Sequence, residues 1–511
     1  MHDKEKGVSL TRREFLLGAV AVTSGIPGCY KSLPNNPGNV KPKGEQKTGA
    51  SVNNNPPPTT SPPAKTPQAG KPAKVSDHVL YYEREDAEYE EYRHCFNKRI
   101  THSPKIIAVC LNDTGVQEAV KYANYYQLPI AVKSGGHSFE GYCLNSDGMV
   151  IVLSKMNSMN YDASSGRFVA GAGCKLGNIY KYLNKHGKLI PAGSCGGVGV
   201  AGLTLGGGYG FFSRQHGLTC DHLTRVKMVD GNGKLHNSDD EPELLWACRG
   251  GGNGNFGIIT ELTFDTVAAP QHFTSYRFKF YKLDPKKATD AAQLWFAQMK
   301  ALPLSCYSAF VLNNKTLTIL MTDTNERANA ALKGILEKLK AHAHKSYAGK
   351  KRPLLKALAI YQGRPDPLYF KNVSAGYYKE FKDIAPVFQD IVATMQKQRG
   401  TLLQINTLGG EIGNVKKQGT AAYPHREFNF LGELQVYFNK PSQETKAVKT
   451  VQSIQAQFNK AGVTSHYRNY PDIDLPNWQK AYYGDSYTRL QSFKERYDPY
   501  DHIRHPQSIK G

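Results

Sequence analysis

Two glycine-rich loops each carry one residue that could react with a ligand or bind one. Residues 134–138, Ser-Gly-Gly-His-Ser, hold His137, and the longer glycine-rich loop 193–210 holds Cys195. Glycines remove the Cβ atoms that would obstruct a phosphate or a flat ring, and they leave backbone amides free to donate. A cysteine in such an amide-rich loop is expected to favour its thiolate. His137 alone would be read as a structural histidine, but the second loop turns the pair into a predicted cofactor site.

A third glycine-rich stretch, residues 252–257, matches the dinucleotide fingerprint in its letters. A Rossmann site needs a helix that opens at the third glycine. Residues 258–264 are instead rich in β-branched side chains and alternate in polarity, which predicts a strand. The loop can bring its amides to a pyrophosphate, but not on a Rossmann helix. A glycine-rich hairpin without a ligand is the alternative.

The carboxyl-terminal half places amide side chains at strand spacing. Residues 402–410 read as a strand whose period of two puts Gln404 and Asn406 on one face. Gln435 likewise interrupts the apolar run 434–438. Buried glutamines need polar partners. Sugar hydroxyls and a neighbouring strand are equally good partners at this stage.

The elements that must hold these residues alternate between strands and helices. Short strands are expected at 129–133, 149–153 and 167–170, and a helix over 115–126 is expected to be capped by Asp113 and Thr114. From about residue 270 further strands at 276–280 and 316–321 and a helix around 328–343 follow. This pattern predicts an α+β fold.

Length and composition limit the classes of protein. A chain of 511 residues suggests two or three domains, and 40% hydrophobic residues with 21% charged exclude wholesale disorder. The net charge of +22 could indicate a polyanion partner, but no basic run exceeds three residues and no nucleic-acid or zinc motif occurs. No apolar run reaches the roughly 18–20 residues of a spanning helix. We expect no nucleic-acid partner and no metal.

The first 75 residues are typical of an export signal followed by a spacer. Residues 11–17 resemble the twin-arginine export motif, followed by an uncharged stretch of signal-peptide length, so 1–28 is predicted to be a signal peptide. Residues 26–29 resemble a lipoprotein box with Cys29 as the lipidated residue. Residues 29–75, rich in proline, asparagine and lysine, are predicted to be a disordered tether. Export on the twin-arginine route to the periplasm, the cell surface or the medium is therefore expected.

The loops at this separation resemble the berberine-bridge-enzyme-like flavoprotein oxidases, of the PCMH-type (vanillyl-alcohol-oxidase) FAD-binding fold, and in particular their glucooligosaccharide oxidase branch. The resemblance spans roughly residues 100–511. Its motifs are Gly-Gly-His at 135–137, Cys195 with Val198-Gly199 and 206–208, the stretch 250–257, Tyr467-Arg468-Asn469-Tyr470 with Asp472, Tyr482-Tyr483-Gly484, Tyr497-Asp498-Pro499 and 507–509.

This resemblance implies a division of the chain. It gives a two-part FAD-binding domain at 76–268, an antiparallel-sheet substrate domain with helices at 269–460, and a C-terminal segment at 461–511 that returns to complete the flavin site.

The resemblance also implies a bicovalent FAD. In the family the histidine matched by His137 bonds the flavin 8α-methyl carbon and the cysteine matched by Cys195 bonds C6. Such a double anchor suits an open cleft and a long substrate. The implied cofactor-binding residues are Ser134, Gly135, Gly136, His137, Ser138, Cys195, Val198, Gly199, Gly202, Gly252, Asn253, Gly257 and Ile259.

By the same resemblance, Tyr470 is the base that takes the substrate hydroxyl proton, provided that its neighbours lower its pKa. Gln404 and Gln435 match substrate-contacting glutamines. The oligosaccharide branch carries an aspartate where this chain has Asn406, and a tyrosine where it has Phe139 in the substrate cleft. Asn406 cannot take a proton, so it is expected only to position the Tyr470 hydroxyl.

These inferences predict an exported FAD-dependent oxidase that converts a carbohydrate's anomeric alcohol to a lactone and O₂ to H₂O₂. Val198, three residues after Cys195, should leave room for O₂. A phenolic, alkaloid-like or polyketide substrate on the same fold is one alternative, and a lipid-tethered surface protein with a vestigial flavin fold is another. Of nine cysteines, seven remain after Cys29 and Cys195, so complete pairing within the chain is excluded.

Overall fold

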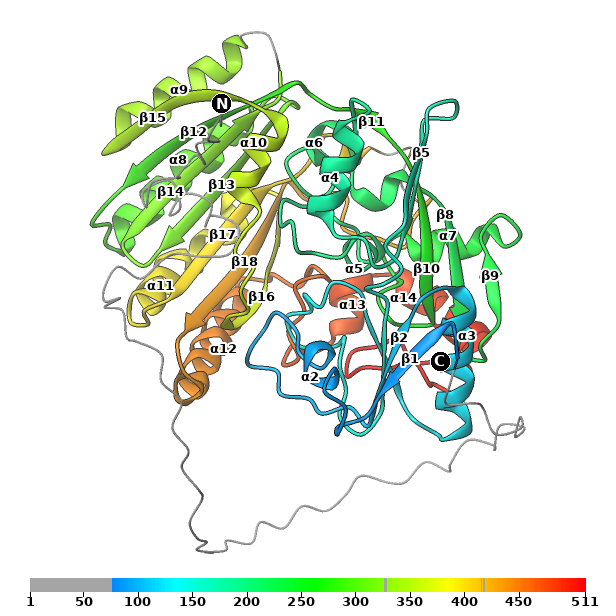
Figure 1. Ribbon diagram of the computed structural model, residues 1–511. Coiled ribbons are helices and arrows are strands. Elements are labelled where there is room, and N and C mark those ends of the chain that lie inside the picture. Colours follow the sequence, from blue (N-terminus) through cyan, green and yellow to red (C-terminus); the bar gives the residue numbers. More distant parts are fainter. Residues whose placement is uncertain (1–75, 326–328, 415, 417–418) are drawn as a thin grey trace, which may run out of the picture.

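The computed structural model describes residues 76–325, 329–414, 416 and 419–511. The predicted signal peptide (1–28) and tether (29–75), with Cys29, lie outside the described residues. The described chain forms β-sheets of four, five and seven strands with helices packed around them (Figure 1), which confirms the predicted α+β class. None of its helices is both long and apolar enough to span a bilayer.

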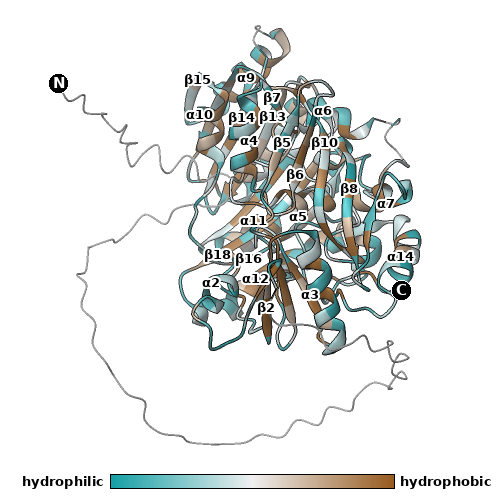
Figure 2. Ribbon diagram, turned by 45° about the vertical axis from the view of Figure 1, so that its right-hand side comes forward, coloured by the Kyte–Doolittle hydropathy of each residue, from teal (hydrophilic) through white to brown (hydrophobic). Residues whose placement is uncertain are grey.

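The four-stranded sheet is built from the first described strands. Its order is β1 (Val79–Tyr82), β2 (Ile106–Cys110), β4 (Met149–Val152) and β3 (Ile130–Lys133), with the last three parallel. All of β2 is buried, and its strand is hydrophobic in Figure 2. One face packs on α3 (Asp113–Tyr125) and the other on α2 (Tyr89–Tyr92), which is why the strand does not alternate in polarity.

The cap predicted for α3 is wrong by one residue. The Asn112 side chain, and not that of Asp113 or Thr114, accepts the Gly115 N–H at 3.0 Å. Asn112 is extended, as an N-cap residue must be, while Asp113 already has helical geometry. Sequence spacing alone could not distinguish these three adjacent capping residues.

The five-stranded sheet is antiparallel and contains the strand that replaces a Rossmann helix. Its order is β5 (Met159–Asp162), β6 (Arg167–Gly171), β10 (Gly257–Asp265), β8 (Leu223–Asp230) and β9 (Leu235–Asn237). β10 begins at the third glycine of the fingerprint, which confirms the predicted strand. A Cβ on Gly257 would lie 2.2 Å from Met228 Sδ, so this glycine allows β10 and β8 to pair closely.

Short elements connect these two sheets and pack around them. They are α4 (Leu176–Asn184), β7 (Lys188–Leu189), α5 (Val200–Leu205), α6 (Ser213–His216), α7 (Pro242–Cys248) and β11 (Val267–Ala268).

The second half of the chain forms a seven-stranded antiparallel sheet. Its order is β15 (Lys345–Pro353), β12 (His272–Phe280), β14 (Thr316–Asp323), β13 (Cys306–Asn313), β17 (Thr401–Thr407), β18 (Phe430–Phe438) and β16 (Tyr369–Tyr378). Helices α8 (Pro285–Met299), α9 (Ala330–His342), α11 (Ala385–Gln396) and α12 (Glu444–Lys460) lie on its outer side, and α10 (Leu354–Leu358) packs on α4 (Figure 1).

The two faces of this sheet have different environments. Leu403, Ile405, Leu434 and Val436 face the outer helices in an apolar core. The alternate residues of β17 and β18 face the N-terminal sheets and include most of the polar side chains of both strands. This period of two confirms that Gln404 and Asn406 share a face opposite Leu403 and Ile405.

The C-terminal segment returns to the N-terminal sheets, as the fold prediction required. It contains α13 (Trp478–Tyr483) and α14 (Ser486–Tyr497). The buried Lys494 ammonium donates to Asn255 O at 2.8 Å and to Asp498 Oδ2 at 2.6 Å, and Ile503 bridges to Ile130 beside β3. The predicted division after residue 268 falls between β11 and β12, and the division after 460 falls at the end of α12.

Candidate active site

A cavity lies between the N-terminal sheets and the inner face of the seven-stranded sheet. The first side is formed by 134–139, the loop from Gly193 to Phe211, and Asn253, Gly254, Gly257 and Ile259. The opposite side is formed by residues of β13, β14, β16, β17 and β18, and the C-terminal segment adds 467–471, Arg504 and His505. The three parts of the chain therefore meet at one site.

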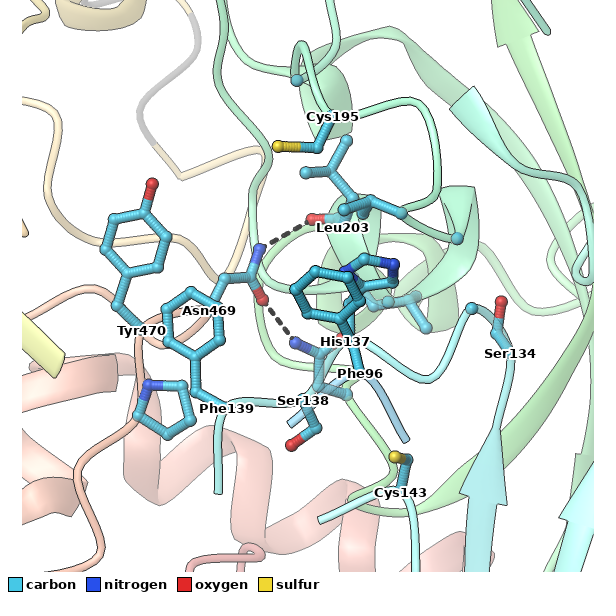
Figure 3. A pocket seen from close by; sticks show the side chains of 18 of the residues that line it. Phe96, Ser134, His137, Ser138, Phe139, Cys143, Cys195, Leu203, Asn469 and Tyr470 are labelled. Atoms are coloured by element: carbon cyan, nitrogen blue, oxygen red, sulfur yellow. Dashed lines mark hydrogen bonds between the residues drawn. The ribbon is translucent and has the colours of Figure 1, made fainter. Parts of the chain in front are cut away.

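The loops that carry His137 and Cys195 touch each other through their glycines. A Cβ on Gly135 would lie 2.3 Å from Gly199 N, and a Cβ on Gly197 would lie 3.0 Å from His137 Nε2. Only residues without side chains permit this approach. The glycine pattern thus brings the imidazole and the thiol to one end of the cavity, where Figure 3 shows both.

His137 is held as a neutral imidazole. Its ring stacks on Phe96, with centroids 4.6 Å apart. Burial and the nearby Lys175 ammonium lower the pKa of His137 to about 4, because both disfavour the charged form. A ring nitrogen with a free lone pair is therefore available at neutral pH.

The thiolate expected at Cys195 is not favoured. Burial and the Glu433 carboxylate raise the pKa of Cys195 to about 12. The amides of the loop are used elsewhere, since Gly196 N–H donates to Gln362 O and Val198 N–H to Cys195 O. A glycine-rich loop stabilises a thiolate only where its amides point at the sulfur, and sequence does not reveal that direction.

Tyr470 lines the cavity beside Phe139 (Figure 3). Its ring stacks on Phe139 at 5.4 Å with an angle of 9° between the planes, and its hydroxyl lies 2.6 Å from that of Tyr209. The Glu433 carboxylate, which lines the same cavity, acts on it electrostatically. Burial and the Glu433 carboxylate raise the pKa of Tyr470 well above its usual range. The lowered pKa required by the sequence interpretation is therefore wrong for these surroundings.

Buried charges fix the Phe139–Tyr470 pair. Lys371, 1% exposed, donates to Asp472 Oδ1 at 2.7 Å and also pairs with Glu140. These carboxylates stand one residue after Phe139 and two after Tyr470, on different parts of the chain. A buried ion pair of this kind is destabilising to break, so the two aromatic rings are held in register.

Asn406 does not reach Tyr470. It is fully buried behind the cavity wall, and its amide oxygen accepts from Tyr307 at 2.5 Å and from Gln404 at 2.8 Å. The predicted role of positioning the Tyr470 hydroxyl therefore belongs to other groups. Among the described residues that hydroxyl hydrogen-bonds to Tyr209, and the Glu433 carboxylate acts on it electrostatically.

The two predicted glutamines differ in position. Gln404 lines the cavity, and its Oε1 is buried without a hydrogen-bond partner among the described residues. Gln435 lies outside the lining residues and accepts from Tyr437 at 3.0 Å. Asn372 on β16, which the sequence interpretation missed, lines the cavity, and its Oδ1 is also unpartnered in this part of the chain.

Most of the other predicted residues line the cavity. Those that do are Ser134, Gly135, Gly136, Ser138, Phe139, Val198, Gly199, Gly202, Asn253, Gly257 and Ile259. Gly252 does not, because it packs on Leu205 and donates its N–H to Leu205 O at 3.1 Å. Asn253 instead donates to Asn469 at 2.6 Å, which bonds in turn to Leu203 O (Figure 3).

Comparison with known proteins agrees with this architecture. Residues 104–239 match the profile described as "FAD binding domain", and 466–510 match "Berberine and berberine like". The FAD-linked oxidoreductase dpmaF of Metarhizium anisopliae is 30% identical, with 83% of this chain and 87% of that protein covered.

The chain belongs to the berberine-bridge-enzyme-like FAD-linked oxidoreductases.

Two further proteins are similar to this oxidoreductase. The chitooligosaccharide oxidase of Gibberella zeae is 29% identical over 81% of this chain and 89% of that protein. The Physcomitrella patens BBE-like 1 structure has the same fold, with a TM-score of 0.78, 22% identity, and 84% and 96% of the two chains covered. The protein is thus an FAD-linked oxidoreductase that acts on CH–OH groups.

The residues of the oxidoreductase fit FAD. The N–H groups of Gly135, Gly136, His137 and Ser138 donate to no backbone carbonyl in the described chain, although backbone donors in such places are nearly always paired. Consecutive free amides form an anion cradle suited to a pyrophosphate. Arg504 and His505 line the same cavity, and His505 stacks on Tyr142 at 4.5 Å.

Proposed function

We propose that this oxidoreductase converts the anomeric CH–OH of a mono- or oligosaccharide to a lactone, with O₂ as the acceptor that becomes H₂O₂. The observation that carries the proposal is a pair of buried oxygens without hydrogen-bond partners in the described chain, Gln404 Oε1 and Asn372 Oδ1. Both residues lie on the side of the cavity formed by the seven-stranded sheet, which we call the substrate wall. Burying amide oxygens without partners is unfavourable. Sugar hydroxyls, which donate hydrogen bonds in several directions, would satisfy both.

The aromatic side chains of the same wall suit a sugar ring. Phe370 and Tyr437 line the cavity beside the two amides, and Phe139, from the opposite side, packs edge-on against Phe370 with ring centroids 5.6 Å apart. Apolar ring faces can cover the C–H face of a pyranose while the amides hold its hydroxyls, which is the division of labour usual in ligand pockets. The chitooligosaccharide oxidase in the family supports the same substrate class.

FAD, when bound, supplies the acceptor for the hydrogen that leaves the substrate carbon with its electron pair. The residues of the chain have the other tasks. Gln404 and Asn372 orient the sugar, and Tyr470 takes the proton of the reacting hydroxyl. The Phe139 ring stacked on Tyr470 limits where that phenol can point.

We further propose that His137 and Cys195 bond the flavin at its 8α-methyl carbon and C6. The neutral imidazole at one end of the cavity and the thiol on the touching loop support two anchors on one ring system. A twice-anchored flavin needs no enclosing walls, so a long saccharide can project from the cleft.

Export on the twin-arginine route, with a tether at 29–75 and a lipid on Cys29, remains part of the proposal. Its support is the sequence of residues 11–29. Loading the cofactor before transport would be consistent with an extracellular oxidase. The released protein should begin at or near Cys29, which N-terminal mass spectrometry of the membrane fraction would test.

A phenolic or polyketide substrate is the second candidate, because Phe139, Phe370, Tyr307, Tyr361 and Tyr437 all line the cleft. The third sequence-based reading, a surface protein with a vestigial flavin fold, is not carried forward. The free amides of the 135–138 loop and the family membership favour a working cofactor site.

Anaerobic bleaching of the flavin absorbance with panels of oligosaccharides and phenolic compounds tests the proposal. We expect saccharides to bleach it, and Gln404→Leu to raise KM by about 3- to 10-fold, the range for one lost hydrogen bond. Gln396→Leu, which removes a glutamine that donates to Leu283 O outside the lining residues, is the matched control and should change KM less. Bleaching by phenolic compounds alone would contradict the carbohydrate assignment.

A further inference from the structure

Glu433 on β18 is the only carboxyl-bearing residue among those that line the described cavity, and the sequence interpretation did not use it. Its side chain is 5% exposed. Acidic side chains are seldom this buried without a cationic partner. A carboxyl buried in the cavity in this way indicates a functional role.

The register of the sheet places Glu433 beside Tyr470. Glu433 lies opposite Ser374 on β16 and opposite Gln404 on β17. Ser374 N–H donates to Tyr470 O at 2.9 Å, which fixes the backbone of Tyr470 against this row. Glu433 and Tyr470 line the same cavity, and the Glu433 carboxylate acts electrostatically on the Tyr470 hydroxyl.

In the part of the chain that the structure describes, the groups that pair with Glu433 or interact with it electrostatically are neutral. From its own strand these are Gln435 and Tyr437. From the other elements packed against it they are Gln404, Tyr307, Tyr209, Cys195 and Tyr470. Of the two arginines that line the cavity, Arg468 donates to Tyr483 at 2.8 Å and Arg504 donates to Asp501 O at 3.0 Å. Without a counter-charge, burial raises the pKa of Glu433 to about 8, and its interactions with Gln435 and Tyr470 only partly oppose this.

Tyr470 alone cannot be the final acceptor of the substrate proton. It already carries a proton, and burial beside a carboxylate makes its phenolate form unfavourable. Tyr209, the other hydroxyl at 2.6 Å, has its pKa raised in the same way. A phenol can take the substrate proton only if its own proton leaves at the same time.

We propose that the Glu433 carboxylate is the proton acceptor of substrate oxidation, reached through the Tyr470 hydroxyl. This inference rests on the proposed function of Tyr470. The substrate O–H bond breaks as a new O–H bond forms on Tyr470, and the original Tyr470 O–H bond breaks as one forms on Glu433. The substrate carbon gives up its hydrogen with the electron pair to the flavin, and the carboxylate ends with one proton more.

The role has a pH signature, and its sign follows from the acceptor's chemistry. The acceptor must be ionised before substrate arrives, so oxidation should be slow below about pH 8 and rise as the pH passes that value. If the Glu433 carboxyl had only a structural role, the oxidation rate would not rise in this pH range.

The test uses the flavin-loaded enzyme and its Glu433→Gln variant. We expect the anaerobic rate of flavin reduction in Glu433→Gln to fall by about 10²-fold or more, the scale for losing a proton acceptor, and to lose the rise near pH 8. Glu433→Asp should restore part of the rate and the rise. Glu261→Gln, a half-buried carboxylate paired with Arg225 outside the cavity, is the matched control and should keep both.

A second readout is independent of turnover. Removing the negative neighbour should let the Tyr470 phenol ionise at lower pH, so ultraviolet titration of Glu433→Gln should show one tyrosinate forming earlier than in wild type. That change should vanish in Glu433→Gln/Tyr470→Phe. If Glu433→Gln does not fold, the wild-type pH profile and Glu433→Asp decide.

The outcomes separate the two proposals. Any substrate that bleaches the flavin serves for this experiment, so failure of sugars alone leaves it intact. A slow Tyr470→Phe with normal rate and pH profile in Glu433→Gln would overturn the role of Glu433 only. A normal rate in Tyr470→Phe would overturn the base assignment itself.

Discussion

The cavity has a cofactor wall, formed by the glycine-rich loops, and a substrate wall, formed by the inner face of the seven-stranded sheet. The two walls differ in the groups that contact the ligand. The cofactor wall is made of loops in which the backbone does the work: glycines touch at 135 and 199, and four consecutive amides have no backbone acceptor in the described chain. The substrate wall is a sheet face in which side chains bond to one another, as Asn406 does to Gln404 and Tyr307. The first wall needs particular glycines, whereas the second needs a particular strand register.

This difference explains which substitutions each wall should tolerate. A backbone site fails when a side chain is added, because two chains can no longer approach. A side-chain site fails when one polar group is removed and its partners are left unpaired. The predictions below test this contrast from the strongest effect to the weakest.

The largest effect is expected on the cofactor wall from removing both reactive residues. His137→Ala and Cys195→Ala should each keep covalent flavin through the remaining bond, and the double variant should lose it. Flavin fluorescence on a denaturing gel measures this directly. Persistent fluorescence in the double variant would place the attachment elsewhere.

Tyr470→Phe tests the C-terminal segment, which lines the cavity beside the substrate wall. The ring and its stacking on Phe139 remain, so the flavin spectrum should not change, but anaerobic flavin reduction should slow by about 10²-fold or more. Stopped-flow absorbance supplies the rate. An unchanged rate would move the base to another residue.

A pair of glycine substitutions compares contact with open space on the cofactor wall. A Cβ on Gly135 would meet backbone at 2.3 Å, whereas one on Gly202 would meet nothing within 4 Å. Gly135→Ala should therefore destabilise the protein by about 1–3 kcal/mol in urea unfolding, the usual range for overpacking. Gly202→Ala, the matched control, should unfold close to wild type. Equal stabilities would remove the argument that the loops must touch.

The smallest effect is expected at Val198, which lines the cavity between the two walls. Val198→Leu should slow reoxidation of the reduced enzyme by O₂ without slowing its reduction by substrate, because a single methylene is felt in close packing. Mixing reduced enzyme with aerated buffer gives the rate. Slow reoxidation of the wild type would instead favour a quinone or protein acceptor.

The sequence predicted the cofactor wall better than the substrate wall. The strand starting at Gly257 is confirmed, and Gly135 and Gly199 line the cavity and touch, because a glycine's role depends on local backbone geometry. The state of the Cys195 thiol was not, because the direction of its neighbouring amides is a tertiary property.

On the substrate wall the period of two already put Glu433 on the same face as Gln435. That signal was available, but it did not reveal which side chain would meet Tyr470. The contact between Glu433 and Tyr470 depends on β16, which pairs with β18 and also bonds to the backbone of Tyr470. Tyr470 lies nearly a hundred residues along the chain from its partner Ser374, so sequence spacing does not reveal this contact. The family resemblance suggested that Asn406 positions the Tyr470 hydroxyl. In the structure the Asn406 amide oxygen accepts a hydrogen bond from Tyr307 instead.

Peptide mapping of the wild-type holoenzyme by mass spectrometry tests the central claim most directly. If the cavity holds FAD between the two touching loops, proteolysis should release one flavin that joins the peptide containing His137 to the peptide containing Cys195. Finding both peptides free of flavin mass, in protein that still carries the yellow chromophore, would contradict the account.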